Sequence, residues 1–580
     1  MVKFSISRNL DGEDEIKQQL SSVSTSFCLA KWLQVSIHLP AGLTQSCYHP
    51  PVHNIPLSEL ENNPRALHNT VHKVLERKKM WEGKRPAGCS YCWKIEDRGH
   101  LSDRHYRSGE GWAQSGFDKV LEGSWDENIN PHYVEVNFNQ SCNFKCTYCS
   151  PHLSTEWEKE IDKFGPINIG YNKHNDIDAL VDKGLMPIKS TAKENPYVEA
   201  FWKWWPDLYS ELKVFRMTGG EPLMDKNTFK VLDYVNKNPN QLLELSITSN
   251  MCPPQPKLFD QFITNIKNIE NDITQEVYND WIDRGILKEV TYFAESDPAI
   301  NWQNWQRAIV LDDSTVDDPT IDPKKQRLTL EDIGLEFDSR NRTEHGDFLY
   351  TLIWFKPNEN LEWKCLGAPP SDEEGNQGVM LNVPRIKNFM LFASIDSVGK
   401  QAEYIRNGLD WQVFQDNVHK FLRNTKNSEI TFINTFNFLS ITGFKHFLEY
   451  ILELKMKFSE SKDLCRIWFD IPLLSDPIWM NADFAVFYPD MLDILDDCVK
   501  FMEQNRETEQ GLGFTQFEIA KVKRNISIIK NSKIKLDDVK NRKFQFYNYF
   551  KQLDSRRNTS FVKTFPELSA VWKDCEKIKY

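Results

Sequence analysis

Long hydrophobic runs are missing from this sequence of 580 residues: no apolar stretch approaches the roughly 18 residues that a membrane-spanning helix needs. An excess of positive charge is also missing. The 83 Asp and Glu residues outnumber the 71 Lys and Arg residues and leave a formal net charge of −12. General nucleic-acid binders normally carry a basic surface, so this charge balance weighs against nucleic acid as a partner.

A signal peptide is not expected either. Residues 1–15 are acidic and contain no apolar core of the kind that directs secretion. The protein is therefore predicted to be cytoplasmic and to make no contact with a membrane. In that reducing compartment the 12 cysteines are expected to be metal ligands and core thiols rather than disulfides.

Apolar material for a sizeable core is present, since 40% of the residues are hydrophobic and 12% are aromatic. The length predicts about three or four domains. A barrel would absorb about 200 or more of these residues.

Three cysteines lie close together at Cys142, Cys146 and Cys149, in the spacing C-x3-C-x2-C. They follow a predicted strand over 132–138, in which apolar and polar residues alternate. Loops at the carboxyl ends of strands carry the chemistry of barrel and open α/β folds. Three thiolates can each hold one iron of a [4Fe–4S] cube, leaving one iron open, since four thiolates are the full complement. A zinc site with His152 as fourth ligand, or a set of buried thiols, is the alternative.

A glycine-rich turn follows the next predicted strand, over 212–218. Its two glycines allow a sharp turn and a close approach to a ligand, and Glu221 then presents a carboxylate. Taken alone, this turn would be read as a structural one. The third predicted strand, over 243–247, ends in the polar residues Ser249 and Asn250, which are candidate cofactor-binding residues. The turn itself consists of Gly219, Gly220, Glu221 and Pro222.

Together, the three-cysteine loop and the Gly-Gly-Glu-Pro turn resemble the radical SAM superfamily. The resemblance implies a [4Fe–4S] cluster whose open iron chelates the amino and carboxylate groups of S-adenosylmethionine. It also implies that the turn, with Glu221, binds the methionyl ammonium, and that Tyr148 packs near the adenine; Phe144 fits the same pattern. A flavodoxin- or ferredoxin-like reductant would supply the electron, and a 5′-deoxyadenosyl radical would then abstract hydrogen from a substrate.

A later segment, residues 389–397, best matches the fourth strand of this family. In related enzymes a Ser of the strand end and an Arg on the next helix hold the ribose and carboxylate of the cofactor. The resemblance therefore implies cofactor contacts for Ser394, Asp396 and Arg406. The alternatives are helix capping for the first two and a surface ion pair with Glu403 for Arg406. With two further strand-like runs, the count reaches six strands, which fits an α/β fold of the partial (β/α)6 TIM-like barrel type.

Four other cysteines precede the barrel. Cys28 and Cys47 flank a predicted hairpin that brings them together, and Cys89 and Cys92 follow as a C-x2-C pair. The hairpin resembles that of SPASM and twitch domains, which implies an auxiliary iron–sulfur cluster on these four thiols. Such modules usually follow the barrel, whereas this one precedes it and is interrupted by a predicted helix over 64–80. Zinc is the alternative.

His49 and His53 could replace a ligand of that site, although such histidines more often lie outside the ligand shell. Residues 96–131 are polar and rich in glycine, and are predicted to connect this module to the barrel.

Three domains are therefore predicted. Residues 21–100 form a SPASM/twitch-like auxiliary module, 130–475 form the radical SAM partial barrel, and 476–580 form a helical C-terminal extension. Insertions in the barrel are expected at about 152–200 and 286–385.

The expected function is that of a radical SAM oxidoreductase acting on a peptide or protein side chain, the usual substrate of relatives with SPASM-like modules. A radical SAM enzyme acting on RNA or on a small metabolite is one alternative. A non-catalytic, zinc-stabilised interaction protein is the other, and it would have no need of the Gly-Gly-Glu-Pro turn.

Overall fold

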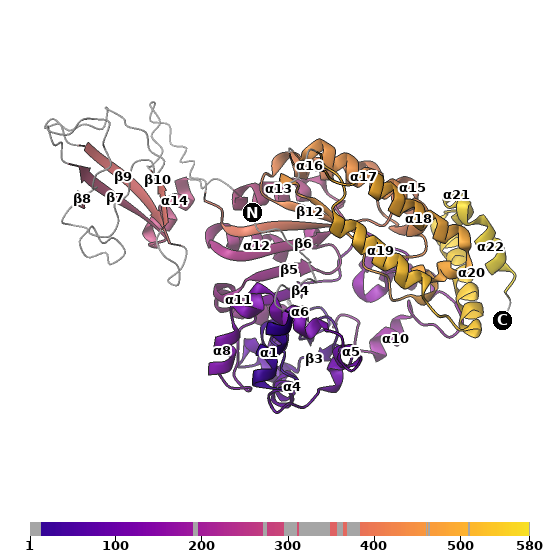
Figure 1. Cartoon of the computed structure of the whole chain (residues 1–580), viewed down its shortest axis with the longest axis horizontal. Coiled ribbons are helices and arrows are strands. Elements are labelled where there is room, and N and C mark those ends of the chain that lie inside the picture. Colours follow the sequence, from indigo (N-terminus) through magenta and orange to yellow (C-terminus); the bar gives the residue numbers. More distant parts are fainter. Residues whose placement is uncertain are drawn as a thin grey trace. The chain divides into compact units, whose positions relative to one another are not determined.

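Nine strands assemble into one sheet in the computed structural model, which describes residues 13–188, 195–270, 275–294, 310–311, 348–356, 364–367, 383–459, 461, 464–508 and 511–578. The strand order is β13-β12-β11-β6-β5-β4-β1-β2-β3 (Figure 1). The bounds are β1 Gln34–His38, β2 Leu43–Gln45, β3 His53–Asn54, β4 Tyr133–Asn137, β5 Val214–Thr218, β6 Asn240–Ser249, β11 Ile386–Ser394, β12 Glu429–Ile433 and β13 Ile467–Asp470.

The six strands expected of the barrel, β4, β5, β6, β11, β12 and β13, are neighbours in chain order. The pairs β4·β5, β5·β6, β11·β12 and β12·β13 are parallel. This confirms an α/β fold with a sheet rich in parallel pairs, which is compatible with a radical SAM fold. The N-terminal hairpin extends the same sheet, because β1 is parallel to β4 and antiparallel to β2.

Helices cover the apolar face of this sheet. The helices are α11 (Pro196–Glu211), α12 (Lys226–Lys237), α13 (Pro256–Glu270), α16 (Trp411–Asn424) and α17 (Ser440–Phe458). Ring contacts fix three of them on that face: Phe201 of α11 on Phe215, Phe262 of α13 on Phe389, and Phe414 of α16 on Phe432, with ring centroids 6.0–6.3 Å apart. Burial of apolar faces between helices and a parallel sheet is the usual source of stability in such folds.

The C-terminal part is helical, as its pattern predicts. It contains α18 (Pro489–Gln504), α19 (Gln516–Lys530), α20 (Leu536–Arg557), α21 (Phe561–Thr564) and α22 (Ser569–Glu576). Helix α20 packs against α15 (Gly399–Ile405), with the rings of Phe550 and Tyr404 6.2 Å apart. Among the described residues, none of the helices has the length and apolar character needed to cross a membrane.

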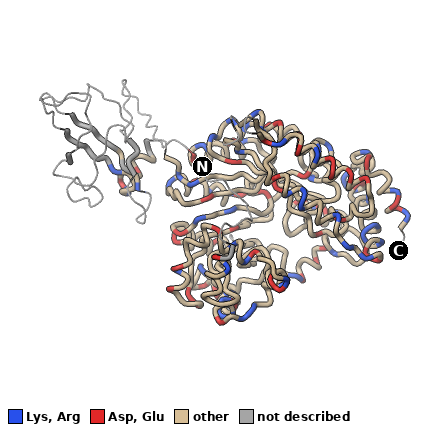
Figure 2. Tube along the Cα trace, in the orientation of Figure 1, with Lys and Arg blue, Asp and Glu red and all other residues tan. Residues whose placement is uncertain are grey.

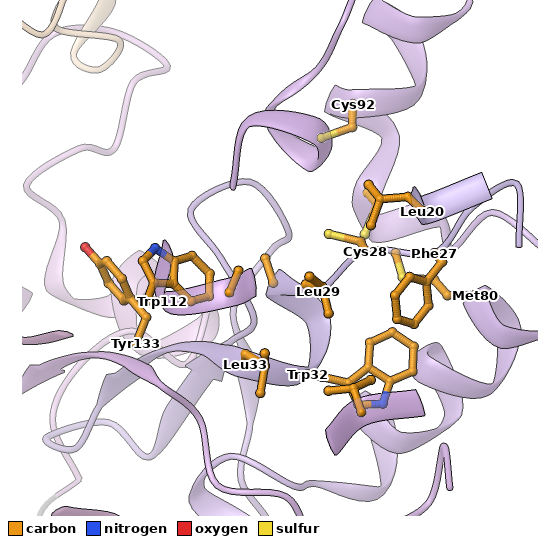
Figure 3. Packing of buried hydrophobic residues seen from close by; sticks show 14 of the residues in the cluster. Leu20, Phe27, Cys28, Leu29, Trp32, Leu33, Met80, Cys92, Trp112 and Tyr133 are labelled. Atoms are coloured by element: carbon orange, nitrogen blue, oxygen red, sulfur yellow. The ribbon is translucent and has the colours of Figure 1, made fainter. Parts of the chain in front are cut away.

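The N-terminal part has a core of its own, in which Phe27, Trp32 and Met80 pack beside Cys28 (Figure 3). Two expectations are corrected there. The predicted connection over 96–131 contains helices α6 (Asp103–Gly109), α7 (Gly111–Gln114) and α8 (Phe117–Glu122). The predicted helix over 64–80 is divided into a 3-10 turn, Pro64–Leu67, and α4 (Val71–Trp81), whose first turn is capped by Thr70. The other helices are α1 (Glu13–Val23), α2 (Ala30–Leu33), α3 (Leu57–Leu60) and α5 (Ser90–Glu96).

The chain divides into two compact units. The first unit comprises Met1–Phe229, Leu243–Phe262 and Asn388–Tyr580, and the second comprises Lys230–Leu242 and Ile263–Lys387. The predicted N-terminal module and C-terminal extension both lie in the first unit, because β1 shares the sheet of β4 and α20 packs on α15.

The second unit contains most of the predicted insertion at 286–385. Its strands β7 (Leu287–Ala294), β8 (Val310–Leu311), β9 (Phe348–Phe355) and β10 (Lys364–Gly367) form an antiparallel sheet. Helix α14 (Gln275–Asp283) packs on this unit through Trp281, which contacts the ring of Phe355 at 5.7 Å.

Candidate functional site

The three-cysteine loop leaves the carboxyl end of β4 and runs beside the chain that follows α15. The backbone N–H of Lys145 donates to the carbonyl of Asn407 at 2.9 Å, and that of Thr147 donates to the carbonyl of Ile405 at 2.7 Å. Gly408 has a φ of +113°, and a Cβ there would lie only 2.8 Å from the carbonyl oxygen of Asn143. Only glycine combines that backbone conformation with so close an approach.

The Gly-Gly-Glu-Pro turn holds the other side of the loop. The backbone N–H of Glu221 donates to the carbonyl of Ser141 at 2.7 Å. A Cβ on Gly220 would clash with that same carbonyl, and Gly219 has a φ of +122°. The close approach expected of the two glycines is therefore made, in the described structure, to the backbone of the cysteine loop.

Glu221 is buried, and protein donors surround its carboxylate. Oε1 accepts from the Ser249 hydroxyl at 2.8 Å and from the Leu223 N–H at 3.0 Å, and Oε2 accepts from the Asn250 N–H at 2.6 Å. Burial raises the pKa of Glu221 to about 7, and these three hydrogen bonds oppose that shift. The carboxylate thus ties the end of β5 to the end of β6, and Pro222 starts the buried turn that follows it.

Arg406, Asp396 and Tyr148 form a buried network beside Cys146. The Arg406 Nε lies 2.8 Å from Oδ2 of Asp396, and their side chains are 7% and 0% exposed. The Tyr148 hydroxyl donates to the same carboxylate at 2.8 Å. Arg406 Nη1 donates to the Cys146 sulfur at 3.9 Å. Arg406 is therefore not the surface partner of Glu403, and a cation stands next to the central thiol of the loop.

Asp396 does not cap the following helix, because its side chain accepts from Arg406 and from the backbone N–H of Thr435 at 2.9 Å. Ser394 ends strand β11 in register with Ile433 of β12 and is half-buried. The site residues expected at the ends of β5, β6 and β11 thus all lie at the carboxyl edge of the sheet.

The thiols of the loop are buried or half-buried. Burial raises the pKa of Cys142 and of Cys146, and Arg406 opposes the shift at Cys146. Burial and the neighbouring Cys146 raise the pKa of Cys149 to about 12. Such thiols ionise when a bound cation stabilises the thiolate.

The donor set fits an iron–sulfur cluster: three free thiols on one short loop, with a guanidinium beside them. Among the residues that the structure describes, no group of three or more His, Cys, Asp or Glu side chains is arranged to hold a single metal ion. His152, the fourth ligand of the zinc alternative, has its Nδ1 3.1 Å from the Ser150 hydroxyl.

The four N-terminal cysteines converge on one pocket with an empty volume of about 490 Å³, part of it open to solvent. Figure 3 shows Cys28 and Cys92 on the apolar core of the N-terminal part. Burial raises the pKa of Cys47 and of Cys92 to about 12. All four cysteines of this pocket are free of disulfides: Cys28, Cys47, Cys89 and Cys92.

Buried cations border this pocket. Lys31 is 2% exposed and pairs with Glu76 at 2.6 Å. Burial alone would lower the pKa of Lys31, but the Cys89 thiol and Glu76 raise it above its ordinary value. Arg104 also lines the pocket and pairs with Glu96 at 2.8 Å. Positive charge of this kind stabilises thiolates, so the four thiols lining one pocket fit an anionic cluster. Like the other residues that the structure describes, they are not arranged to hold a single metal ion.

The two histidines near Cys47 are engaged elsewhere. His49 lies at the pocket, but its Nε2 is 2.6 Å from Asp103 and its ring stacks on Tyr91. The Nε2 of His53 is 2.9 Å from the Thr70 hydroxyl.

Several residues that hold the cysteine loop were not predicted from the sequence. Trp157 donates from its indole to the Cys146 carbonyl at 2.8 Å. Tyr549 of α20 donates from its hydroxyl to the Thr147 carbonyl at 2.6 Å. For the contact at Gly408, the local signal in the sequence was the glycine itself, two residues after Arg406. A tyrosine some 400 residues away in the sequence gives no local signal.

Comparison with known proteins gives one weak similarity. The chain is 24% identical over 163 residues to the GTP 3′,8-cyclase of Campylobacter lari, an alignment that covers 27% of this chain and 40% of that enzyme. No family model and no solved structure matches. The cysteine loop and the Gly-Gly-Glu-Pro turn both lie at the carboxyl edge of a sheet rich in parallel pairs. The similarity to the GTP 3′,8-cyclase supports the predicted resemblance to the radical SAM superfamily. It gives no support to the predicted twitch or SPASM module.

Proposed function

We propose that this protein is a radical SAM enzyme with its [4Fe–4S] cluster on Cys142, Cys146 and Cys149. The observation that carries the proposal is the direct contact between the two motifs, in which the Glu221 N–H donates to the Ser141 carbonyl. When bound, the cluster and S-adenosylmethionine would supply a 5′-deoxyadenosyl radical that abstracts hydrogen from a substrate. The chain itself fixes the loop, places Arg406 beside Cys146 and shields the site from water.

The methionyl ammonium needs an acceptor, and Asn137 fits better than Glu221. The carboxylate of Glu221 already accepts three hydrogen bonds from the protein. The Oδ1 of Asn137 is buried, has no hydrogen-bond partner among the described residues, and lies against Gly219. Tyr148 and Ser394 remain proposed contacts of the adenosyl part. Arg406 would donate to the methionyl carboxylate while it stays paired with Asp396.

For the four N-terminal cysteines we propose an auxiliary iron–sulfur cluster in a twitch-like site, with zinc as the alternative. Four thiolates close the coordination, so the centre would transfer electrons or stabilise the fold. The buried Lys31 and Arg104 support an anionic centre of either kind.

The proposed substrate is a peptide or protein side chain, and a flavodoxin- or ferredoxin-like protein would be the reductant in the cytoplasm. Figure 2 shows Lys and Arg interspersed with Asp and Glu along the chain, which supports a substrate other than RNA. The similarity to a GTP 3′,8-cyclase favours a second candidate, a nucleotide or other small metabolite.

Metal analysis tests both cysteine sets. The protein is reconstituted without oxygen, and wild type is compared with the variant Cys142→Ala/Cys146→Ala/Cys149→Ala. The proposal expects the variant to lose one cluster and to keep iron at the N-terminal site. Zinc without iron in the variant would show that the N-terminal site is a structural zinc site. An iron content equal to that of the wild type would show that the three-cysteine loop binds no cluster.

A further inference from the structure

The strands beside the cysteine loop carry polar side chains on one face. Ser36 of β1 is in register with Glu135 of β4, and Glu135 is in register with Arg216 of β5. Residues paired in this way point to the same side of a sheet, and Gln34 lies two residues before Ser36 and shares that side. The other side of the same strands is apolar and covered by α11.

Two of these side chains are buried without a partner. Gln34 is 0% exposed and Ser36 is 1% exposed. Neither amide atom of Gln34, nor the hydroxyl of Ser36, has a hydrogen-bond partner among the residues that the structure describes. An unpaired buried polar group costs about 1–3 kcal/mol, and native proteins rarely leave one unexplained. Two such groups side by side on one face therefore point to a bound polar group.

The charges on this face cancel. Arg216 Nε lies 3.6 Å from the Glu135 carboxylate, with side chains 25% and 17% exposed. The guanidinium lies over the ring of Phe392 at 4.3 Å, and its Nη2 donates to the Thr248 hydroxyl at 3.3 Å. The pair is thus held in place and is neutral, so it offers a donor and an acceptor without attracting a polyanion.

The face is bordered by both cysteine sites. Strand β4 leads directly into the three-cysteine loop at its carboxyl end. On the other side, Tyr48 follows Cys47 in the chain and lines the four-cysteine pocket. Its hydroxyl lies 2.6 Å from that of Tyr133 and donates to Glu135 at 3.3 Å. A molecule held on this face would therefore lie within the proposed active site.

We propose that Gln34, Ser36, Glu135 and Arg216 form a subsite for the amide groups of a peptide substrate. The free amide of Gln34 offers one donor and one acceptor, the complement of an amide N–H and C=O. Ser36 adds a further donor and acceptor. A neutral, mixed set of this kind suits an amide and disfavours a triphosphate, which would meet the carboxylate of Glu135. This inference rests on the proposed function and assigns residues that would hold its peptide substrate.

Ligand-detected NMR on the reconstituted full-length protein with S-adenosylmethionine tests the subsite. The probes are a set of N-acetylated, C-amidated tripeptides, GTP, and a short RNA oligonucleotide. We expect the peptides to bind and Gln34→Leu to weaken that binding roughly five- to a hundredfold. The same substitution should raise the Tm of the ligand-free protein by about 1 °C or more, since it removes an unpaired buried amide.

Gln114→Leu is the matched control. The Gln114 amide donates to Gln19 at 2.9 Å and to the Ser108 carbonyl at 2.6 Å. Its replacement should lower the Tm and leave peptide binding unchanged. Ser36→Ala serves as a second variant and should weaken peptide binding without unfolding the protein.

Three results would overturn the inference. The first is unchanged peptide binding in both Gln34→Leu and Ser36→Ala, and the second is a lower Tm in Gln34→Leu. The third is that Gln34→Leu weakens the binding of GTP and not that of the peptides. Titration of S-adenosylmethionine into the same samples reports separately on the proposed function. If the cofactor binds and the peptides do not, the subsite fails alone; if the cofactor does not bind, the proposed function fails first.

Discussion

Glu221 was predicted as a cofactor contact, and the structure shows which protein groups its carboxylate binds. The turn motif predicts an acceptor for the cofactor's ammonium, but in the folded chain the carboxylate is surrounded by three protein donors. In the described structure these hydrogen bonds join the ends of β5 and β6. The Oδ1 of Asn137, beside Gly219, is buried and has no hydrogen-bond partner among the described residues.

Replacing Asn137 with Leu should weaken S-adenosylmethionine binding roughly ten- to a hundredfold, because a hydrogen bond to a charged group contributes about 1.5–3 kcal/mol. Iron content should stay unchanged, since Asn137 is no cluster ligand. Calorimetric titration of the cofactor into the reconstituted protein measures this. Asn137→Asp keeps the acceptor and should keep the affinity. An unchanged dissociation constant in Asn137→Leu would mean that Asn137 does not bind the ammonium and would favour Glu221 as its acceptor.

Gly220 supports a prediction about the cluster rather than the cofactor. A Cβ at this position would clash with the Ser141 carbonyl, so Gly220→Ala should displace the cysteine loop and reduce the iron bound after reconstitution by half or more. Gly111→Ala is the matched control, because a Cβ at Gly111 meets nothing within 4 Å. Equal iron contents in the two variants would show that the loop does not depend on this contact.

At the scale of elements, the parallel strands could be predicted from the sequence where apolar and polar residues alternate, as over 132–138, or where a short apolar run occurs, as over 212–218. The predicted strands over 212–218 and 132–138 match β5 and β4 to within two residues at each end. The pairing of β1 with β4 could not be predicted, since 99 residues separate the paired positions and no local pattern encodes a partner. The helices within 96–131 were missed because their glycines suggested a loop.

The site residues also divide into those that the sequence could predict and those that it could not. The cysteines and the Gly-Gly-Glu-Pro turn are local motifs, and their occurrence together made them candidates. Arg406 was placed near the cofactor by resemblance, but its partner Asp396 and its contact with Cys146 depend on how two distant segments pack. The contact of Tyr549 with the loop depends on packing in the same way.

Strand β12 carries a carboxyl group that makes stability depend on pH. Burial raises the pKa of Glu429 from 4.5 to about 7, with the nearby Glu244 adding to the shift. The native protein therefore holds a proton that the unfolded chain releases above pH 4.5. The free energy of unfolding should fall as the pH rises from about 4.5 to 7, by at most about 3 kcal/mol.

Glu429→Gln should flatten this dependence and leave the protein more stable than wild type at pH 8. Denaturant unfolding between pH 4.5 and pH 8 is the measurement. A slope identical to that of the wild type would mean that Glu429 ionises at its ordinary pKa in the folded state.

At the scale of the whole chain, the C-terminal helices are part of the proposed metal site. Tyr549, 0% exposed, holds the Thr147 carbonyl. Arg557 pairs with Glu160 at 3.1 Å, and Glu160 also binds Lys145 of the cysteine loop at 2.6 Å. The last helices therefore fix the loop that would carry the cluster.

Tyr549→Phe should release cluster iron to a chelator several times faster than the wild type, because the buried carbonyl of Thr147 loses its partner. Absorbance of the cluster over time after addition of the chelator measures this rate. Tyr547→Phe, on the same helix, is the control, because the Tyr547 hydroxyl donates to the exposed Glu576, whereas the Thr147 carbonyl of the cysteine loop accepts from Tyr549. Equal rates of iron release in the two variants would mean that the Tyr549 hydroxyl of α20 does not help to retain the cluster.

The central claim is that Cys142, Cys146 and Cys149 hold a cluster that cleaves S-adenosylmethionine. The most direct measurement is the formation of 5′-deoxyadenosine by the anaerobically reconstituted protein with dithionite. We predict formation by the wild type and by Cys498→Ala, whose thiol is buried in α18, and none by Cys146→Ala. Formation by Cys146→Ala at the wild-type rate, or no formation by an iron-loaded wild type, would contradict the account.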